Sequence, residues 1–204
     1  MRPTSGKVLA SGTELSTLST RELRAHRARI GFVHQDHSLV PNLRVSQNVI
    51  SGKLGQLGFF GALRAMVRPN QADLEHALEL LEAVGIGDKL FERTDRLSGG
   101  QQQRVAIARA LFQEPSALLA DEPVASVDPA RARDLMKLLV RLASERGLPL
   151  IVSLHDIEIA REFFPRTIGL RNGQLVFDCP TASLTTADFS ELYRLENKAH
   201  LRAR

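Results

Sequence analysis

The stretch that decides the fold runs from Leu97 to Leu111 and reads LSGGQQQRVAIARAL. It opens with Ser98, which can cap a helix, followed by Gly99 and Gly100, so several backbone N–H groups lie bare at the positive end of a helix. Such a helix end binds phosphate, and the glycines let phosphate oxygens approach closely. A capped helix start alone would be purely structural. At average residue usage, however, the string Leu97 to Gln101 arises by chance only about once in a million positions.

An apolar run follows at 117–120 and ends in Asp121 and Glu122. We predict a strand buried on both faces, with the two carboxylates at the carboxyl edge of the sheet, where parallel sheets bind ligands. Asp121 is suited to hold magnesium, directly or through water, and Glu122 to orient a water for attack on a terminal phosphate. An isolated Asp-Glu pair would more often mark a simple exit into a polar turn. Its place shortly after a phosphate-binding stretch favours the functional interpretation.

Three further residues complete the candidate site. His155 and Gln35 each follow a predicted strand, so both are expected at the same carboxyl edge of the sheet. His155 could hydrogen-bond a phosphate oxygen or the attacking water, and Gln35 could contact the metal or the water as a neutral amide, although a lone histidine there is more often structural. Asp128 precedes Pro129 and predicts a helix cap, which accounts for at least part of its role.

The rest of the chain alternates apolar strands with amphipathic helices, the pattern of an α/β fold with a mainly parallel sheet. The last two strands flank Asn172-Gly173, which favours a tight turn with positive φ and hence an antiparallel hairpin. The leucines at 74, 78 and 81 recur at helical spacing and predict a core-facing stripe. Strands are predicted at 7–10, 30–33, 117–120, 150–153, 167–170 and 174–177, and helices at 71–84, 99–112, 129–146 and 157–163.

Residues 39–96 contain no convincing strand and predict a helical insertion within a single domain of residues 1–204. Several glycines interrupt the insertion, and Phe59-Phe60 lies among them. We expect this part to be either a flexible loop that docks a partner or a mobile surface connection, and the sequence favours neither.

Composition narrows the class of protein. The 204 residues are 43% hydrophobic and 25% charged, as in one globular domain, and no apolar run is long enough to cross a bilayer. A single cysteine fits a reducing cytosol. The net charge of +4 has its excess near the two ends, in arginines at 21, 24, 27 and 29 and in basic residues at 194, 198, 202 and 204. With one tyrosine and no tryptophan for base stacking, we expect no nucleic-acid partner; a solvated basic face or attraction to an anionic membrane leaflet explains the charge.

These motifs resemble, in order and spacing, those of ATP-binding-cassette ATPases. The signature is Leu97 to Gln101, the Walker B strand ends at Glu122, and the Ser126 to Asp128 loop, His155 and Gln35 complete the set. The resemblance implies a P-loop-NTPase-type core with a helical subdomain at about 39–96, and two such domains that sandwich two ATP molecules. It further implies nucleotide contacts, with the signature acting in trans, by Ser98, Gly99, Gly100, Gln101 and Asp128. Asp121 and Gln35 would bind Mg²⁺. Glu122 would be the catalytic base, and His155 would sense the phosphate.

Within that family, the stretches around Leu97 to Leu111, Leu119 to Pro129, Ser153 to Phe177 and Ser51 to Gly55 resemble phosphonate importers. That resemblance implies a second ATPase subunit, transmembrane permease subunits and, indirectly, a periplasmic or extracellular solute-binding protein as partners. It places the chain peripherally at the cytoplasmic face of the inner membrane. Two alternatives stay open: a non-catalytic cassette that donates its signature motif in trans, and a soluble cassette protein of translation or DNA repair.

One feature departs from the family pattern. A phosphate loop reads Gly, four residues, then Gly-Lys-Ser/Thr, so that amides and a lysine hold the phosphates. The 204 residues contain no such sequence, since Gly6-Lys7 is followed by Val8. We therefore expect a truncated cassette that lacks the N-terminal strands and phosphate loop, through a misplaced start, a broken gene or a deliberate fragment. Such a chain is expected to be inactive alone, with an exposed sheet edge and an open core.

Overall fold

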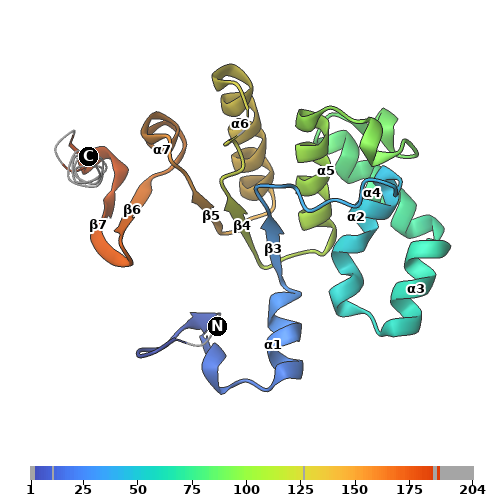
Figure 1. Cartoon of the computed structure of the whole chain (residues 1–204), viewed down its shortest axis with the longest axis horizontal. Coiled ribbons are helices and arrows are strands. Elements are labelled where there is room, and N and C mark those ends of the chain that lie inside the picture. The colour runs from blue at the N-terminus through green and yellow to red at the C-terminus, as the bar shows by residue number, and fades with distance from the viewer. Residues whose placement is uncertain (1–2, 11, 126, 186–187, 189–204) are drawn as a thin grey trace, which may run out of the picture. The chain divides into compact units, whose positions relative to one another are not determined.

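The computed structural model describes residues 3–10, 12–125, 127–185 and 188 (Figure 1). The chain forms two compact units, Met1–Ser153 and Leu154–Arg204. Each unit is described by itself. Within the described residues, no helix combines the length and the apolar character needed to cross a membrane.

The first unit is built on a parallel sheet of three strands in the order β3-β4-β5 (Figure 1). The strands are β3 (Ile30–Val33), β4 (Ala117–Asp121) and β5 (Leu150–Ser153), all where the apolar runs predict them. Val33 lies opposite Ala120, and Asp121 lies opposite Ser153. The predicted α/β class is confirmed, and this register brings the carboxyl ends of the three strands to one edge.

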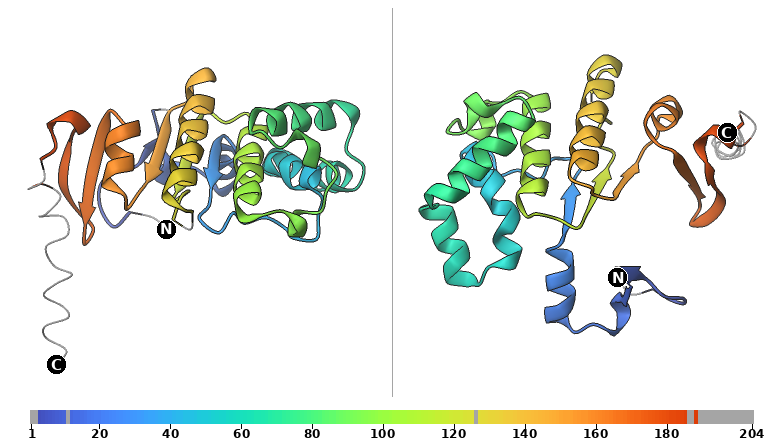
Figure 2. Two further views of the ribbon diagram at one scale, coloured as in Figure 1. Left: turned by 90° about the horizontal axis from the view of Figure 1, so that it is seen from above. Right: turned by 180° about the vertical axis from the view of Figure 1, so that it is seen from behind.

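Two long helices beside this sheet begin at the predicted caps (Figure 2). Helix α5 (Gly99–Phe112) has Ser98 as its N-cap, and α6 (Pro129–Glu145) has Asp128, whose carboxylate accepts a hydrogen bond of 3.1 Å from the Arg131 amide. Pro129 occupies the first turn of α6, where its missing N–H is harmless. Both helices bury an apolar face in the core.

The sheet is not buried equally on its two faces. Leu118 and Ala120 are buried, but Phe32, Leu119 and Ile151, which are neighbours across the strands, lie on the opposite and more open face. Phe32 is 37% exposed and Ile151 is 66% exposed. The prediction that β4 is buried on both faces is therefore wrong, because only alternate residues of the strand meet packed helices.

The segment 39–96 is helical, as predicted, with α2 (Val45–Ile50), α3 (Phe59–Val67) and α4 (Gln71–Ala83). Short 3₁₀ turns lie at Ser51–Gln56, Gly87–Lys89 and Thr94–Arg96. The expected loop at Phe59-Phe60 is wrong, since Gly58 is an N-cap and the good helix formers that follow extend α3. The leucine stripe of α4 is correct only in part: Leu81 is buried with Ala77 and Leu80, whereas Leu74 and Leu78 are half-buried.

The N-terminal part contains a short antiparallel pair, β1 (Leu9–Ala10) and β2 (Thr13–Glu14), so the strand predicted at 7–10 is shorter than expected. A 3₁₀ turn at Leu15–Thr17 leads to α1 (Thr20–Arg27), which was not predicted. This helix carries much of the early basic cluster and buries no residue, so it lacks the apolar periodicity that indicates a helix. The sequence feature that indicates the start of this helix is the capping box formed by Ser19 and Glu22.

The second unit contains α7 (Ile157–Phe163) and an antiparallel hairpin of β6 (Arg166–Arg171) and β7 (Gln174–Pro180), followed by a 3₁₀ turn at Thr181–Ser183. Asn172 and Gly173 have φ angles of 49° and 74°, which confirms the predicted hairpin turn. The late basic residues at 194, 198, 202 and 204 lie outside the described residues.

Candidate functional site

The acid pair stands at the carboxyl end of the central strand. Asp121 is the last residue of β4 and is exposed, and Glu122 follows it half-buried. Glu122 has a φ of 44°, in the left-handed region that residues other than glycine seldom adopt. Such a conformation costs on the order of 1–3 kcal/mol and persists only where neighbouring groups hold it. The two carboxylates therefore leave the strand from different backbone conformations.

Ser153 holds this strained turn. Its hydroxyl donates a hydrogen bond of 2.6 Å to Asp121 Oδ1 and accepts one of 3.0 Å from the Glu122 amide. Ser153 ends β5 in register with Asp121, so one side chain fixes the carboxylate and the next backbone unit together. The sequence alone did not single out Ser153. Its signal was a polar residue at the end of the strand that precedes His155.

The signature helix is tied to the same turn by a buried amide. Gln103 is 2% exposed, and its Nε2 donates a hydrogen bond of 2.7 Å to the carbonyl of Pro123. This contact joins α5 to the residue that follows Glu122. It gives the last residue of the triple glutamine a role that the motif alone does not reveal.

At the start of the signature helix the predicted cap is present. Ser98 Oγ accepts a hydrogen bond of 3.4 Å from the Gln101 amide, and Gln101 Oε1 accepts one of 2.9 Å from the Ser98 amide. Gly99 and Gly100 are exposed, and a Cβ placed on either would meet no atom within 4 Å. The fold of this chain therefore does not require glycine at these positions, which leaves room for the close approach of another molecule.

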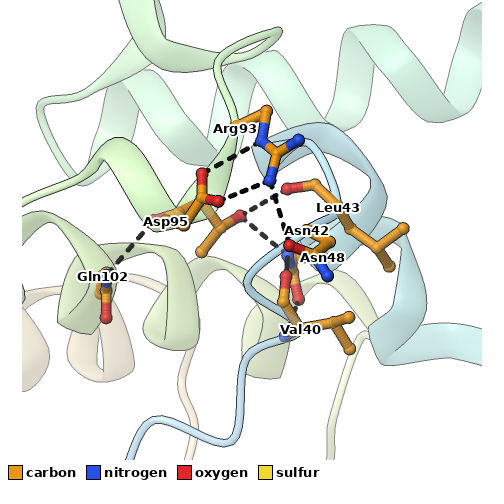
Figure 3. Close-up of polar contacts among 8 residues, drawn as sticks. Val40, Asn42, Leu43, Asn48, Arg93, Asp95 and Gln102 are labelled. Carbon is orange, nitrogen blue, oxygen red and sulfur yellow. Dashed lines mark hydrogen bonds and ion pairs between the residues drawn. The ribbon is translucent and has the colours of Figure 1, made fainter.

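A buried polar network holds the segment before the signature (Figure 3). Asn48 donates to Thr94 Oγ1 at 2.8 Å and to the Val40 carbonyl at 2.9 Å, and it accepts from the Val40 amide at 2.9 Å. Thr94 in turn donates to the Leu43 carbonyl, and Gln102 donates to the Thr94 carbonyl. Both Asn48 and Thr94 are 1% exposed. The network connects the residues that follow the Gln35 loop with the start of α5.

Gln35 lies two residues beyond β3 in an exposed turn. The next residues, His37 and Ser38, have φ angles of 62° and 46°. Arg109 of α5 donates hydrogen bonds to both of their carbonyls, the one to His37 at 2.9 Å. Burial lowers the pKa of the Arg109 guanidinium, and burial also lowers the pKa of His37. The sequence alone did not single out Arg109, whose side chain fixes the turn that carries Gln35.

His155 belongs to the second unit, two residues beyond the end of β5. The next residue, Asp156, caps α7 by accepting hydrogen bonds of 2.8 and 3.1 Å from the amides of Glu158 and Ile159. The convergence of His155 with the acid pair stays a prediction, as does a ligand-binding role for Asp128 beyond its cap. Ser126, the first residue of the expected 126–128 loop, lies outside the described residues.

Comparison with known families decides the class. A family model described as "ABC transporter" matches residues 1–125, more than half of the chain. The chain belongs to the ABC transporter family. This cassette therefore carries the ATP-binding domain of that family.

Curated relatives of the cassette share close to half of its residues. Phosphonates import ATP-binding protein PhnC 2 of Synechococcus sp. (strain JA-2-3B'a(2-13)) is 45% identical over 97% of this chain and 72% of the relative. PhnC 1 of Rhodopseudomonas palustris (strain HaA2) is 44% identical over 97% of this chain and 70% of the relative. PhnC of Anaeromyxobacter dehalogenans (strain 2CP-C) is 49% identical over 98% of this chain, which is 39% of that longer protein.

Solved cassettes have the same fold. The dimeric post-hydrolysis state of the ATP-binding cassette MJ0796 bound to ADP and Pi superposes with a TM-score of 0.72 and 33% identity, over 90% of this chain and 77% of that chain. The cbiO1 subunit from Clostridium perfringens, part of the ABC transporter complex cbiONQ, gives a TM-score of 0.75 and 29% identity over 100% of this chain and 75% of that chain. The predicted ABC ATPase core is thereby confirmed.

The donor atoms of the cassette suit magnesium. Among the described residues no group of three or more His, Cys, Asp or Glu side chains could hold a metal by itself. Mg²⁺ needs only one or two protein oxygens when phosphate oxygens and water complete its shell. Asp121 offers a carboxylate oxygen at the sheet edge and Gln35 an amide oxygen near the end of the adjacent strand. Asp121 and Gln35 therefore offer the kind of oxygen donors that Mg²⁺ prefers.

Proposed function

We propose that this chain is part of the ATP-binding and ATP-hydrolysing subunit of an importer for phosphonate or a related anion. The proposal rests on the membership of this chain in the ABC transporter family and on its similarity to phosphonate-import ATP-binding proteins that are 44–49% identical. The observation that carries the chemistry is the turn after β4, where Ser153 holds Asp121 and the Glu122 amide at the carboxyl edge of the sheet. The Asp121 carboxylate and the backbone of Glu122 are thus held in place before any substrate arrives.

The proposed roles follow from position and donor type. Asp121 and Gln35 would hold Mg²⁺, which when bound neutralises phosphate charge. Glu122 would accept a proton from the attacking water, and His155 would hydrogen-bond the terminal phosphate. The nucleotide-binding residues would be Ser98, Gly99, Gly100, Gln101 and Asp128.

The open surface at Gly99 and Gly100 supports a role in trans. Because a Cβ there would meet nothing in this chain, the space suits a phosphate held by a second cassette. We propose a second ABC ATPase subunit, as a homodimer of full-length chains, and transmembrane permease subunits as direct partners. A solute-binding protein would act indirectly, and the subunit would lie peripherally at the cytoplasmic face of the inner membrane.

We further propose that residues 1–204 act as one cassette domain with a helical subdomain at about 39–96. The 204 residues contain no Gly-x-x-x-x-Gly-Lys-Ser/Thr sequence, so these residues alone would not cradle nucleotide phosphates. A polypeptide of these 204 residues alone would therefore be inactive. Its alternative role is that of a non-catalytic partner that donates Ser98 to Gln101 to an intact ATPase.

The inactivity is tested by phosphate release from Mg²⁺-ATP. We expect none from the purified 204-residue chain. Release that requires Mg²⁺ and disappears in Glu122→Gln would contradict this, because it would show a complete active site.

The role in trans is tested by complementation. The 45% identical Synechococcus relative is prepared with the serine of its own signature changed to arginine, so that its homodimer lacks a signature donor. Addition of this chain should restore phosphate release at least tenfold, and Ser98→Arg in this chain should abolish the rescue. If the chain gives no rescue, the donor role is rejected while the family assignment stands.

The cargo is tested separately. Disruption of the gene in its host should lower uptake of a labelled phosphonate and leave uptake of an unrelated amino acid unchanged. Unchanged phosphonate uptake would overturn the cargo assignment alone.

A further inference from the structure

Helix α3 exposes a face that is more apolar than the face it buries. Phe59 and Phe60 are 77% and 83% exposed, and Leu63 and Val67 are 52% and 74% exposed. The residue that α3 buries is Ala65. A surface helix of a soluble protein has the reverse arrangement, with large apolar side chains toward the core.

The four exposed residues form one stripe. At about 100° per residue, positions 59, 63, 67 and 60 fall within an arc of roughly 100° on the helix. The half-buried Met66 and Ala62 flank this arc on the side of Phe59, and the buried Ala65 lies beyond them. Figure 1 shows α3 at the outer edge of the helical segment, away from the sheet of the first unit. The stripe, which we call the α3 face, comprises Phe59, Phe60, Leu63 and Val67.

Positive charge borders the α3 face. Arg64 lies beside the stripe on α3 and Arg68 is the C-cap residue of the helix. Both are exposed, and neither makes an ion pair or hydrogen bond through its side chain within the described part of the chain. The sequence has no Asp or Glu between Asp36 and Asp73. Lys53, the nearest other cation, pairs with Asp73. The face therefore combines aromatic and aliphatic side chains with unpaired arginines, and α3 itself contains no Asp or Glu.

We propose that the α3 face binds an anionic lipid surface and lies in the headgroup region of the membrane. Helices with Phe and Leu on one side and Lys or Arg beside them bind in this region, and the arginine stems reach along the apolar zone while their charges meet the phosphates. Each such cation near an anionic leaflet adds to the affinity. A uniformly positive border matches a uniformly negative bilayer better than a protein groove of mixed charge. This contact goes beyond the proposed function, because it needs neither nucleotide nor permease.

The test is co-sedimentation of the 204-residue chain with vesicles of phosphatidylglycerol and phosphatidylcholine at equal amounts, against vesicles of phosphatidylcholine alone. We expect binding to the anionic vesicles at least tenfold above the neutral ones, falling as NaCl rises to 0.5 M because salt screens the arginines. Phe60→Ser with Leu63→Ser, and separately Arg64→Glu with Arg68→Glu, should each lower binding at least tenfold. Phe91→Ser, at an equally large residue that is 60% exposed outside α3, should leave it unchanged.

Three results would overturn the proposal. The first is equal binding to neutral and anionic vesicles. The second is an equal loss when Arg24 and Arg27 of α1 are reversed instead, which would show only a general attraction of basic charge. The third is no vesicle binding at all, which would leave the α3 face to a protein partner or to a second copy of the chain.

A spectroscopic readout remains if the charge variants fail to fold. The chain has no tryptophan, so Phe60→Trp introduces a single reporter. Its emission should shift to shorter wavelength on anionic vesicles, and that of Phe91→Trp should not. An unshifted emission from residue 60 would contradict insertion of the α3 face.

Discussion

The Ser153 hydroxyl donates a hydrogen bond of 2.6 Å to Asp121 Oδ1 and accepts a hydrogen bond of 3.0 Å from the Glu122 amide. This single side chain joins two neighbouring strands at the edge where the nucleotide chemistry is proposed. It also compensates for the positive φ of Glu122, which a residue with a side chain adopts only when it is held.

Ser153→Ala should therefore loosen the turn after β4. We expect the free energy of unfolding to fall by about 1 kcal/mol, and exchange of the Glu122 amide hydrogen to rise roughly fivefold. Hydrogen exchange followed by NMR measures the second effect directly. Ser153→Thr keeps the hydroxyl and should retain slow exchange; if alanine and threonine behave alike, the hydroxyl does not hold the turn.

Asn48→Ala should be among the more destabilising polar substitutions in the helical segment. It leaves Thr94 and both backbone groups of Val40 without their buried partner, at about 2–3 kcal/mol in the free energy of unfolding. Urea denaturation gives the value. The control is Asn42→Ala. Asn42 is exposed and accepts a hydrogen bond from Arg93, and its loss should change the free energy of unfolding by no more than about 0.5 kcal/mol. Equal effects of the two would show that the buried network does not hold the segment.

Arg109→Lys should release the turn that carries Gln35. Lysine lacks the planar fork that donates to the carbonyls of His37 and Ser38, so both left-handed residues lose support. Hydrogen exchange of peptides that cover residues 34–40 should become faster, by about fivefold or more. Arg104→Lys removes a different backbone contact, to the Val84 carbonyl, and should leave residues 34–40 unchanged. Slow exchange in the Arg109 variant would contradict the role assigned to it.

Gly100→Ala should separate stability from function. A Cβ at this position meets nothing, and alanine favours helix, so the free energy of unfolding should stay equal or rise by up to about 1 kcal/mol. Rescue of the relative in the complementation assay should nevertheless fall at least tenfold, since the methyl group occupies space proposed for phosphate. Gly52→Ala is the opposite control: its Cβ would collide with the Arg109 carbonyl and should destabilise the chain by about 1–3 kcal/mol. Undiminished rescue by the Gly100 variant would remove the argument for close phosphate approach.

Acidification should weaken the fold through His37. Burial lowers the pKa of this imidazole in the folded chain below its usual 6.5, and its buried Nδ1 has no hydrogen-bond partner among the described residues. As pH falls, His37 therefore gains a proton in the unfolded chain before it does so in the folded chain. The stabilisation of the fold by neutral His37 is fully present above about pH 6.5 and is lost as the pH falls toward the lowered pKa of the folded chain. Urea denaturation at pH 7.5 and pH 5.5 should show a smaller pH effect in His37→Gln than in the parent chain. An identical pH effect in both would exclude His37 as the source.

The strands and helices that the sequence predicted well are those with strong local signals. The bounds of β3, β5, α5 and α7 follow from apolar runs and cap residues that lie within a few positions of each other. The hairpin turn at Asn172 follows from a backbone preference of two residues. Helix α1 and the start of α3 were missed, because one has no apolar face to bury and the other presents its apolar residues to the outside.

By itself, the sequence determined the family, the parallel α/β core and the candidate residues at Ser98, Asp121 and Glu122, because motifs and caps are short-range patterns. Only the tertiary structure decided that Ser153 supports the acid pair, that Arg109 holds the Gln35 turn and that Asn48 meets Thr94 across 46 positions of the chain. Those contacts join residues far apart in the sequence, and no local periodicity records which distant side chain a given polar group will find. The exposed α3 face has the same origin: the sequence predicted a loop or surface connection at Phe59-Phe60, and only the folded chain shows a helix whose apolar side is left uncovered within the described residues.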